Sequence, residues 1–404
     1  MRPFTSTISF DEARRRLDAA VDPITRTERV PLGAAQGRVA AEDIRSSIDV
    51  PPFSRSAMDG YAVIAADTSG ATVASPVRLR VVDRLYTGQA PAVVVSTGTC
   101  AEIATGAPLP AGADAVVMVE QTTKDAGDCV LFATAATAGQ NIGRRGADIS
   151  AGATVVRRGD LLNPGRVGAL AAIGHDSVTV YARPRVAILS TGNEVVEPGR
   201  SLGPGQIFDV NRFTLAAIVE SNGGVADPRA PVEDTIIALA SALDECAGAD
   251  IIVFSGGSSV GERDLIVDVV AERGEMVFHG IAVKPGKPTG FARIGAGRTP
   301  FFAMPGNPTS CLSNAYVLLV PFLRATARLP AAPSRTITVP LGRRIVSQAG
   351  RLQFYTVTVQ QGMAMPAFKG SGEITSLSHA DGFIQIPADQ SVIEEGEAVE
   401  VTLF

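Results

Sequence analysis

Three loops rich in glycine, proline, serine and lysine carry the residues that could do chemistry. Each loop follows a short apolar run, and together they cover residues 255–264, 284–288 and 305–308. In an open α/β sheet, ligands bind at the carboxyl ends of the strands, where small residues let backbone N–H groups approach an anion. The pattern therefore predicts a site for an anionic, phosphorylated ligand held by these loops.

The first of these loops combines bare backbone amides with hydroxyl groups and a carboxylate. Its candidate ligand-binding residues are Ser255, Gly256, Gly257 and Ser258. Asp264 ends the loop where the next helix is expected, so the alternative is a glycine-rich turn in which Asp264 is only the helix N-cap. A buried strand precedes the loop within a strand–helix–strand unit, and this position favours a ligand-binding loop.

The second loop carries two lysines, Lys284 and Lys287, on either side of a Pro-Gly turn. Such a turn can point both ammonium groups in one direction, where they would hold an anion. Two solvated surface lysines are the alternative, but the neighbouring glycine-rich loop favours the anion clamp.

The third loop precedes an expected helix and consists of Pro305, Gly306, Asn307 and Pro308. Its simplest role is a stiff turn with a helix cap. The N-terminus of a helix also attracts anions, because its free N–H groups and its dipole favour negative charge. The two roles can coexist in this loop.

Three acidic residues stand after strands or turns, where they could bind a metal ion or transfer protons. Glu194 follows the turn at Thr191 and Gly192, Asp59 lies in an Asp-Gly pair, and Asp148 follows two arginines. Taken singly, each acid is better explained as structural, namely as a surface acid, a turn residue or half of an ion pair.

The composition limits the class of protein. A chain of 404 residues is too long for one ordinary core, so we expect two to four domains. A net charge of −5 gives no indication of nucleic-acid binding. No apolar run approaches the roughly 18 residues that span a bilayer. The three histidines exclude a histidine-rich metal site, and the four cysteines, which lack metal or disulfide spacing, suit a reducing cytoplasm.

The elements that position these residues fall into four domains. Short β-branched runs with frequent glycine and proline indicate a β-rich domain at 49–139. It interrupts segments 1–48 and 140–180, which we expect to form one helix-containing N-terminal domain. Alternating strands and helices at 181–328 predict a parallel α/β sheet, and alternating strands at 329–404 predict a C-terminal β domain.

Capping residues and periodicity predict individual helices. Ser9 and Asn163 are expected N-caps, and apolar residues recur at helical spacing in 211–221 and 236–243. Residues 30–40 read as strand–turn–helix. No Ser-His-Asp signature, dinucleotide-binding glycine motif or Walker loop stands out. The residues by themselves therefore indicate a multidomain α/β plus β enzyme with a phosphate-type site.

Five ordered motifs resemble those of the molybdopterin molybdenumtransferase family, also called MoeA, which includes the E domain of gephyrin. The motifs are residues 56–61, 190–192, 255–264, 284–288 and 305–308. The resemblance covers essentially the whole chain, and five motifs in the family's order and spacing argue against chance.

The resemblance implies an elongated homodimer of four-domain subunits, in which the N-terminal domain contributes to dimerisation. It also implies insertion of molybdate into adenylylated molybdopterin, which releases AMP and the molybdenum cofactor and uses a divalent cation, usually Mg²⁺. Candidate partners are a molybdopterin adenylyltransferase and molybdoenzyme chaperones, with no role for nucleic acid or membrane.

The family's functional residues carry over onto this sequence by position. The implied catalytic residues are Asp59, Asp148, Glu194, Asp264, Lys284 and Lys287, with Glu194 and Asp264 also as metal ligands. The implied substrate-binding residues are Thr191, Gly192, Asp234, Ser255, Gly256, Gly257, Ser258, Pro305, Gly306, Asn307 and Pro308. Asp59 would act in trans, on the site of the other subunit.

Two positions depart from the family's usual pattern. Asn193 stands where an aspartate is usual, and Ala147 stands where an acid is usual. Each departure removes a negative charge near the implied metal ligands.

Other functions compete with this interpretation. Molybdopterin adenylyltransferases resemble only residues 180–327, and their glycine loop usually reads Thr-Gly-Gly-Thr-Gly, unlike Ser258-Ser259-Val260. A second alternative, closer to molybdate insertion, is the insertion of tungstate by the same chemistry. The third alternative is a gephyrin-like scaffold that has lost catalysis, and the retained acids and lysines argue against it.

Overall fold

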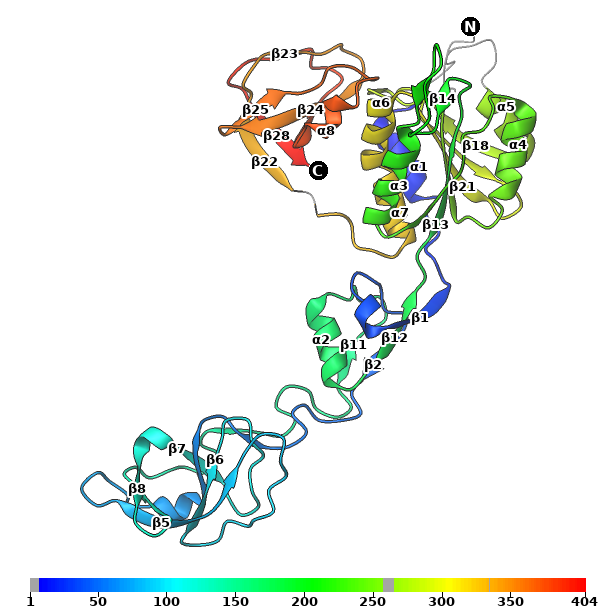
Figure 1. The fold of residues 1–404 in the computed structure, drawn as a ribbon. Coiled ribbons are helices and arrows are strands. Elements are labelled where there is room, and N and C mark those ends of the chain that lie inside the picture. The colour runs from blue at the N-terminus through cyan, green and yellow to red at the C-terminus, as the bar shows by residue number, and fades with distance from the viewer. Residues whose placement is uncertain (1–6, 257–264, 334) are drawn as a thin grey trace. The chain divides into compact units, whose positions relative to one another are not determined.

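The computed structural model describes residues 7–256, 265–333 and 335–404, which form two compact bodies (Figure 1). The larger body contains the chain up to Glu28 together with Gly37–Val39 and Tyr181–Phe404. The smaller body contains Arg29–Gln36 and Ala40–Val180.

A six-stranded sheet forms the centre of the larger body. Its strands, in spatial order, are β16 (Val225–Pro228), β13 (Arg185–Ser190), β17 (Ile251–Ser255), β21 (Thr299–Met304), β20 (Gly290–Ile294) and β18 (Gly274–His279). The first four strands pair in parallel. Strand β20 pairs antiparallel with β21, and β18 pairs antiparallel with β20. All residues of β17 are buried, as expected for a strand covered on both faces.

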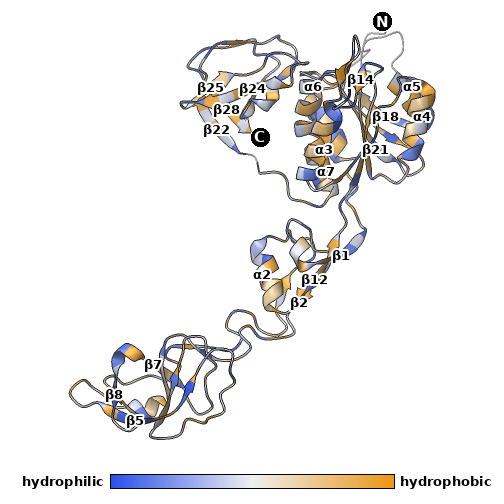
Figure 2. Ribbon diagram, viewed as in Figure 1, coloured by the Kyte–Doolittle hydropathy of each residue, from blue (hydrophilic) through white to orange (hydrophobic). Residues whose placement is uncertain are grey.

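Helices cover both faces of this sheet (Figure 1). On one face lie α1 (Phe10–Asp18), α3 (Asn211–Ser221), α6 (Pro308–Asn314) and α7 (Val320–Thr326). On the other face lie α4 (Ile236–Glu245) and α5 (Leu265–Arg273). Hydrophobic residues recur along the strands and on the helices beside them (Figure 2). The predicted α/β sheet is therefore confirmed, and it is parallel over four strands, with β20 and β18 added in antiparallel pairings. The helices predicted at 211–221 and 236–243 are also confirmed.

Helix α1 begins after Ser9, whose hydroxyl accepts a hydrogen bond from the Glu12 N–H as predicted. Its residues were expected in the N-terminal domain, but its buried face, Ala13 and Leu17, shares the core of the α/β sheet. Arg14 adds a polar contact, because its Nη1 donates to the Val317 carbonyl at 2.7 Å.

The helix expected after the third loop contains a π-helical segment, Ala315–Leu319, between α6 and α7. Pro321 follows this segment and has no N–H group, so it cannot bond the Val317 carbonyl four residues earlier. The Arg14 guanidinium satisfies that carbonyl instead.

The C-terminal residues form most of a second six-stranded sheet. Its elements are β19 (Val283–Lys284), β24 (Leu352–Gln360), β26 (Gly382–Ile386), β28 (Ala398–Leu403) and β22 (Thr336–Pro340), with β25 (Met363–Pro366) paired to β24. Strand β19 comes from the chain of the α/β domain, so the two domains share this sheet. The predicted C-terminal β domain is confirmed.

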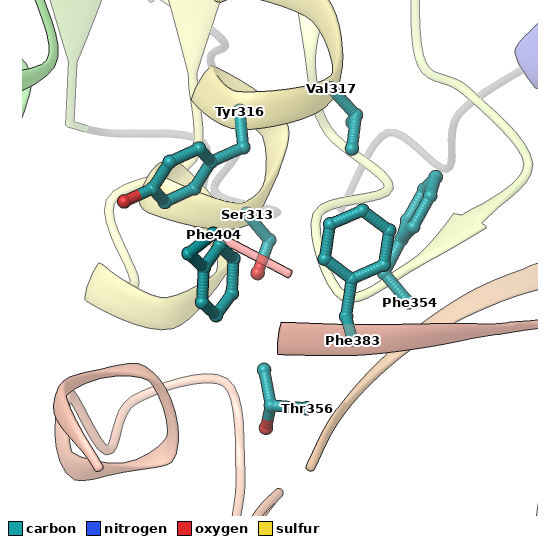
Figure 3. Close-up of a pocket in the computed structure, with 7 residues that line it drawn as sticks. All are labelled: Ser313, Tyr316, Val317, Phe354, Thr356, Phe383 and Phe404. Carbon is teal, nitrogen blue, oxygen red and sulfur yellow. The ribbon is translucent and has the colours of Figure 1, made fainter. Parts of the chain in front are cut away.

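Aromatic side chains also join the C-terminal sheet to the helices of the α/β domain. Phe354 packs edge-on against Phe10 and Phe383, and Phe404 lies against Tyr316 with ring centroids 4.7 Å apart. Several of these rings line a pocket between α6, the π-helical segment and the sheet (Figure 3).

The smaller body contains a mixed β-sheet and a small helical core. The sheet strands are β7 (Ala115–Met118), β4 (Gly60–Val63), β6 (Thr99–Ile103), β5 (Val77–Leu85), β9 (Cys129–Phe132) and β8 (Thr122–Asp125). Helix α2 (Pro164–Ala172) has Asn163 as N-cap, as predicted, and packs with β11 (Thr154–Val156) and β2 (Ile44–Arg45).

The prediction of a helix at the end of residues 30–40 is wrong. Only one 3₁₀ turn, Leu32–Ala34, forms there. Gly37 adopts a φ of +75°, which turns the chain, and Ala40 then pairs with Val180 in an extended bridge. Burial of Ala40 in this bridge outweighs the local helical pattern.

Candidate active site

The strand register brings two of the predicted loops, 255–264 and 305–308, to one edge of the α/β sheet together with the turn that begins at Thr191. Ser190 of β13 pairs with Ser255 of β17, and Ser255 pairs with Met304 of β21. The three parallel strands therefore end level with one another. The segments after them, which begin at Thr191, Gly256 and Pro305, start side by side at the carboxyl edge.

The first two segments are in direct contact. The Thr191 N–H donates to the Ser255 carbonyl at 3.0 Å. A Cβ atom on Gly256 would overlap the Thr191 backbone and hydroxyl, and the φ of Gly256 is +153°. Only glycine fits at this position, so the close approach of the two turns explains its presence.

Asn211, the first residue of α3, joins the second and third segments, although sequence analysis treated it only as a helix start. Its Nδ2 lies 2.7 Å from Ser255 Oγ and 2.7 Å from the Gly306 carbonyl oxygen. Asp209 anchors the first strand end in the same way, because the Ser190 hydroxyl donates to its carboxylate at 2.7 Å.

Two carboxylates lie together beside the first segment. Thr191 pairs with Val232 in a parallel bridge, which places Asp234 next to Glu194. Burial raises the pKa of the Asp234 carboxyl, and the negative charge of Glu194 raises it further. The Asn193 carboxamide oxygen accepts the Asp234 N–H at 3.4 Å, so the residue that departs from the family's pattern has a structural contact.

The lysine loop is fixed to helix α6, which begins at the third segment. Asn314, the last residue of α6, donates from Nδ2 to the Gly286 carbonyl at 3.0 Å and to Thr289 Oγ1 at 2.6 Å. Lys284 lies in β19, paired with Gln353 of the C-terminal sheet. Both Lys284 and Lys287 are partly buried.

The C-terminal domain contributes residues beside the third segment. The Ser371 carbonyl accepts the Thr309 N–H at 3.1 Å, and the Ser371 hydroxyl accepts from Asn307 Nδ2 at 3.1 Å. The Thr309 hydroxyl donates to the Glu373 carbonyl at 2.7 Å. These contacts join residues more than 60 positions apart, so no local sequence pattern indicates them.

The smaller body holds two further acids named from the sequence, Asp59 and Asp148. Asp59 Oδ1 accepts the Thr105 N–H at 2.7 Å, and this bond, followed by one from the Thr105 hydroxyl, lowers the pKa of Asp59. Asp148 is exposed, and the nearby Arg145 pairs with Asp49 at 2.7 Å. The roles of Asp59 and Asp148 stay predictions.

Some of the predicted site lies outside the described residues, namely Gly257, Ser258 and Asp264. Among the residues that the structure describes, no three histidine, cysteine, aspartate or glutamate side chains form a metal-binding group. The Glu194–Asp234 pair still suits Mg²⁺, which one or two carboxylates bind together with waters and substrate phosphates. Within the described chain, none of the helices is long and apolar enough to cross a membrane.

Comparison with protein families gives a match over nearly all of the chain. Residues 8–174 match the MoeA N-terminal region (domain I and II), residues 187–325 match the probable molybdopterin binding domain, and residues 338–404 match the MoeA C-terminal region (domain IV). The chain belongs to the MoeA family.

Individual MoeA relatives are similar over almost their whole length. Molybdopterin molybdenumtransferase 2 of Mycobacterium tuberculosis is 36% identical over 393 residues, which cover 95% of each chain. The molybdopterin molybdenumtransferase of Haemophilus influenzae is 32% identical over 411 residues, with 98% of each chain covered.

Solved MoeA structures share the fold. Two structures of the molybdopterin biosynthesis MoeA protein from Pyrococcus horikoshii superpose with TM-scores of 0.86 and 0.81. They are 39% and 30% identical to this chain and cover 98% and 99% of it, with 99% and 100% of their own chains included. These matches bear out the predicted family and multidomain fold.

Proposed function

We propose that this chain is a molybdopterin molybdenumtransferase that inserts molybdate into adenylylated molybdopterin and releases AMP. Relatives with that name, similar over nearly their whole length, support a transferase of molybdenum cofactor biosynthesis. The observation that carries the proposal is the level ending of three strands, Ser190, Ser255 and Met304, with glycine-containing segments after each.

The chemistry requires a site that tolerates several negative groups at once. Molybdate, the dithiolene of the pterin and the phosphates of the adenylyl group repel one another. Backbone N–H groups at the three strand ends and the ammonium groups of Lys284 and Lys287 would offset this repulsion. The contact between Asn314 and Gly286 supports this arrangement, because it fixes the lysine loop to the helix of the third segment.

Glu194 and Asp234 are the described residues that fit a Mg²⁺ ion. When bound, the ion would supply positive charge next to the phosphate oxygens of the substrate. The nearness of the two carboxylates supports this assignment, because a cation would offset the repulsion from Glu194 that, after burial, raises the pKa of Asp234. Asp264, the other acid named as a ligand, lies outside the described residues.

We also propose a homodimer, in which Asp59 of one subunit serves the α/β site of the other. The Thr105 N–H donates to Asp59 Oδ1 at 2.7 Å and lowers the pKa of that carboxyl, which supports a role as an acceptor in the reaction. The four free, buried thiols support a reducing cytoplasmic setting.

The experiment is a product analysis. Purified protein is incubated with adenylylated molybdopterin, molybdate and Mg²⁺, and the AMP and the molybdenum-containing pterin are quantified by chromatography and metal analysis. We expect equal amounts of both products, and no AMP when molybdate is omitted. AMP release that ignores molybdate, or no product at all, would contradict the proposed function.

A further inference from the structure

Arg212, in the first turn of α3, is a buried cation whose partners lie on three different segments. Its side chain is only 7% exposed. Its Nε lies 3.5 Å from Asp209 Oδ2, its Nη1 donates to the Arg229 carbonyl at 3.1 Å, and its Nη2 donates to Glu197 Oε1 at 2.8 Å. Because the guanidinium group is a rigid plane, it holds these three segments at fixed relative positions.

Two of these segments carry the carboxylates that we assign to Mg²⁺. Glu197 lies three residues after Glu194. Arg229 lies five residues before Asp234, in the segment that follows β16. The guanidinium group therefore ties the segment of one acid to the segment of the other, without contacting either acid itself.

The third partner, Asp209, fixes Arg212 itself. Asp209 Oδ1 accepts the Arg212 backbone N–H at 3.1 Å, and Asp209 Oδ2 accepts the Ser190 hydroxyl at 2.7 Å. Asp209 is only 4% exposed, and a buried charge of this kind is costly to leave without its partner. Arg212 is thus anchored to the end of β13, the strand that leads into the turn of Glu194.

The charges at this edge of the sheet are divided between two tasks. Asp209 and Glu197 both pair with Arg212. Among the residues that the structure describes, no lysine or arginine forms an ion pair with Glu194 or Asp234, and the charge that acts on Asp234 is the negative charge of Glu194. These two acids are therefore left for a cation from outside the chain.

We propose that Arg212 is a positioning residue that sets the spacing of Glu194 and Asp234 for a divalent cation. The inference rests on the proposed function, which assigns the cation to this pair, and it deepens that function by naming the residue that holds the pair in place. Two neighbouring carboxylates repel each other before the cation binds. Their segments need a tie that does not itself neutralise them, and Arg212 qualifies because Asp209 and Glu197 already balance its charge.

The spacing matters because Mg²⁺ forms only short bonds. It takes oxygen ligands at about 2.0–2.1 Å in near-octahedral geometry, so two carboxylates bind one ion only when their oxygens approach closely. A small displacement of either segment moves one carboxylate beyond this range. Residues that orient metal ligands without touching the metal change its affinity by about ten- to a hundredfold.

The test is a titration of the full-length protein with Mn²⁺ in the absence of substrates, followed by electron paramagnetic resonance. Mn²⁺ takes the same carboxylate and water ligands as Mg²⁺. We expect wild-type protein to bind the ion and Glu194→Gln to weaken this binding, which assigns the signal to the carboxylate pair. Arg212→Gln should weaken it by about tenfold. Arg212→Lys keeps the charge but loses the planar fork, so its affinity should lie between those of Arg212→Gln and wild-type protein.

The sign of the change separates positioning from simple electrostatics. Arg212→Gln removes a positive charge near a cation site, which by itself would tighten cation binding. Positioning predicts weaker binding, so unchanged or tighter binding by the folded variant would overturn the inference. Arg26→Gln is the matched control, because Arg26 bonds both oxygens of Asp250 at 2.6 and 2.8 Å, next to the opposite end of β17. It should leave the Mn²⁺ affinity unchanged.

A pair of substitutions at Glu197 makes the test independent of the folding of Arg212→Gln. The Glu197 side chain is 45% exposed, so either replacement is tolerated better than a change at the buried Arg212. Glu197→Gln removes the charge but keeps an acceptor oxygen, whereas Glu197→Ala removes both. We expect Glu197→Ala to bind Mn²⁺ a few-fold more weakly than Glu197→Gln. Equal affinities would show that the contact with Arg212 does not position the Glu194 segment.

Failure of this inference and failure of the proposed function give different results. Wild-type protein that releases AMP with molybdate, while Arg212→Gln binds Mn²⁺ normally, would remove only the inference. Wild-type protein that binds no Mn²⁺, or that binds it no better than Glu194→Gln does, would overturn the inference whatever the AMP assay shows. Absence of AMP release would remove the proposed function, and the Mn²⁺ titrations would still decide the role of Arg212.

Discussion

The carboxamide of Asn314 occupies the space that any side chain at Gly286 would need. Asn314 Nδ2 donates to the Gly286 carbonyl at 3.0 Å, and a Cβ on Gly286 would overlap that nitrogen. Gly286 also has a φ of +96°. The lysine loop is thus fixed to the end of α6 by a contact that only glycine permits.

Gly286→Ala should therefore destabilise the protein and lower its activity. We expect a loss of about 3 kcal/mol in the free energy of unfolding, from the strained φ together with the displaced Asn314 side chain. Denaturation by urea measures this. Gly350→Ala is the matched control, because Gly350 has a φ of +94° but nothing within 4 Å of the added Cβ. We expect about 1 kcal/mol there, and equal losses in the two variants would disprove the clash.

Replacing Asp59 should abolish the reaction without unfolding the chain. Asp59→Asn keeps the size of the side chain but removes its charge, and we expect cofactor formation to fall by at least about a hundredfold. Asp264→Asn should have the same effect. The control is Asp67→Asn, because Asp67 also accepts a backbone N–H, that of Gly98 at 2.9 Å. Normal turnover by Asp59→Asn and Asp264→Asn would remove the assignment of these acids.

The carboxylate pair beside the first strand end should set the requirement for Mg²⁺. Removal of divalent cations with EDTA should stop AMP release, and added Mg²⁺ should restore it. Glu194→Gln should raise the Mg²⁺ concentration for half-maximal rate by roughly tenfold, because one of the two charges that attract the cation is lost. Glu220→Gln, a change on the surface of α3, should leave that concentration unchanged. An unaltered Mg²⁺ dependence in Glu194→Gln would place the cation elsewhere.

The thiols of Cys100 and Cys311 should be unreactive in the folded protein. Burial raises the pKa of each to about 12, whereas an unfolded cysteine titrates near about 8.5. The folded state therefore keeps protons that the unfolded state loses above that pH. Stability should be constant below about pH 8 and should fall as the pH rises from about 9 towards 12.

Thiol titration with a disulfide reagent at pH 8 checks the first part of this prediction. All four cysteines are buried, so we expect rapid reaction only after denaturation in urea. Unfolding measured at pH 8 and pH 10 checks the second part. Cys100→Ala and Cys311→Ala should each reduce the loss of unfolding free energy between these two pH values. Fast labelling of the native protein would contradict the burial of these thiols.

Sequence patterns predicted the elements of the site better than the contacts between them. Continuous apolar runs identified β13 and β17, and helical spacing identified α3, because these signals are local. Asn211 was overlooked as a site residue, since its partners Ser255 and Gly306 lie 44 and 95 positions away. No periodicity records such a pairing.

The placement of α1 shows the same limit. Its amphipathic face and its Ser9 cap predict a helix, and the helix is present. The face itself does not say which core it covers. The deciding contact joins Arg14 to the Val317 carbonyl, which Pro321 leaves without its usual helical partner, and these residues are about 300 positions apart.

The central claim is that the strand-end segments and the lysine loop form one site for the anionic substrates. The most direct measurement is the rate of molybdate-dependent AMP release by wild-type protein and by a Lys284→Ala, Lys287→Ala double variant. Lys124→Ala serves as control, because Lys124 lies in the β-rich domain with its side chain 69% exposed. We predict a loss of at least about a hundredfold in the double variant and a wild-type rate in the control. A double variant that releases AMP at the wild-type rate would contradict the account.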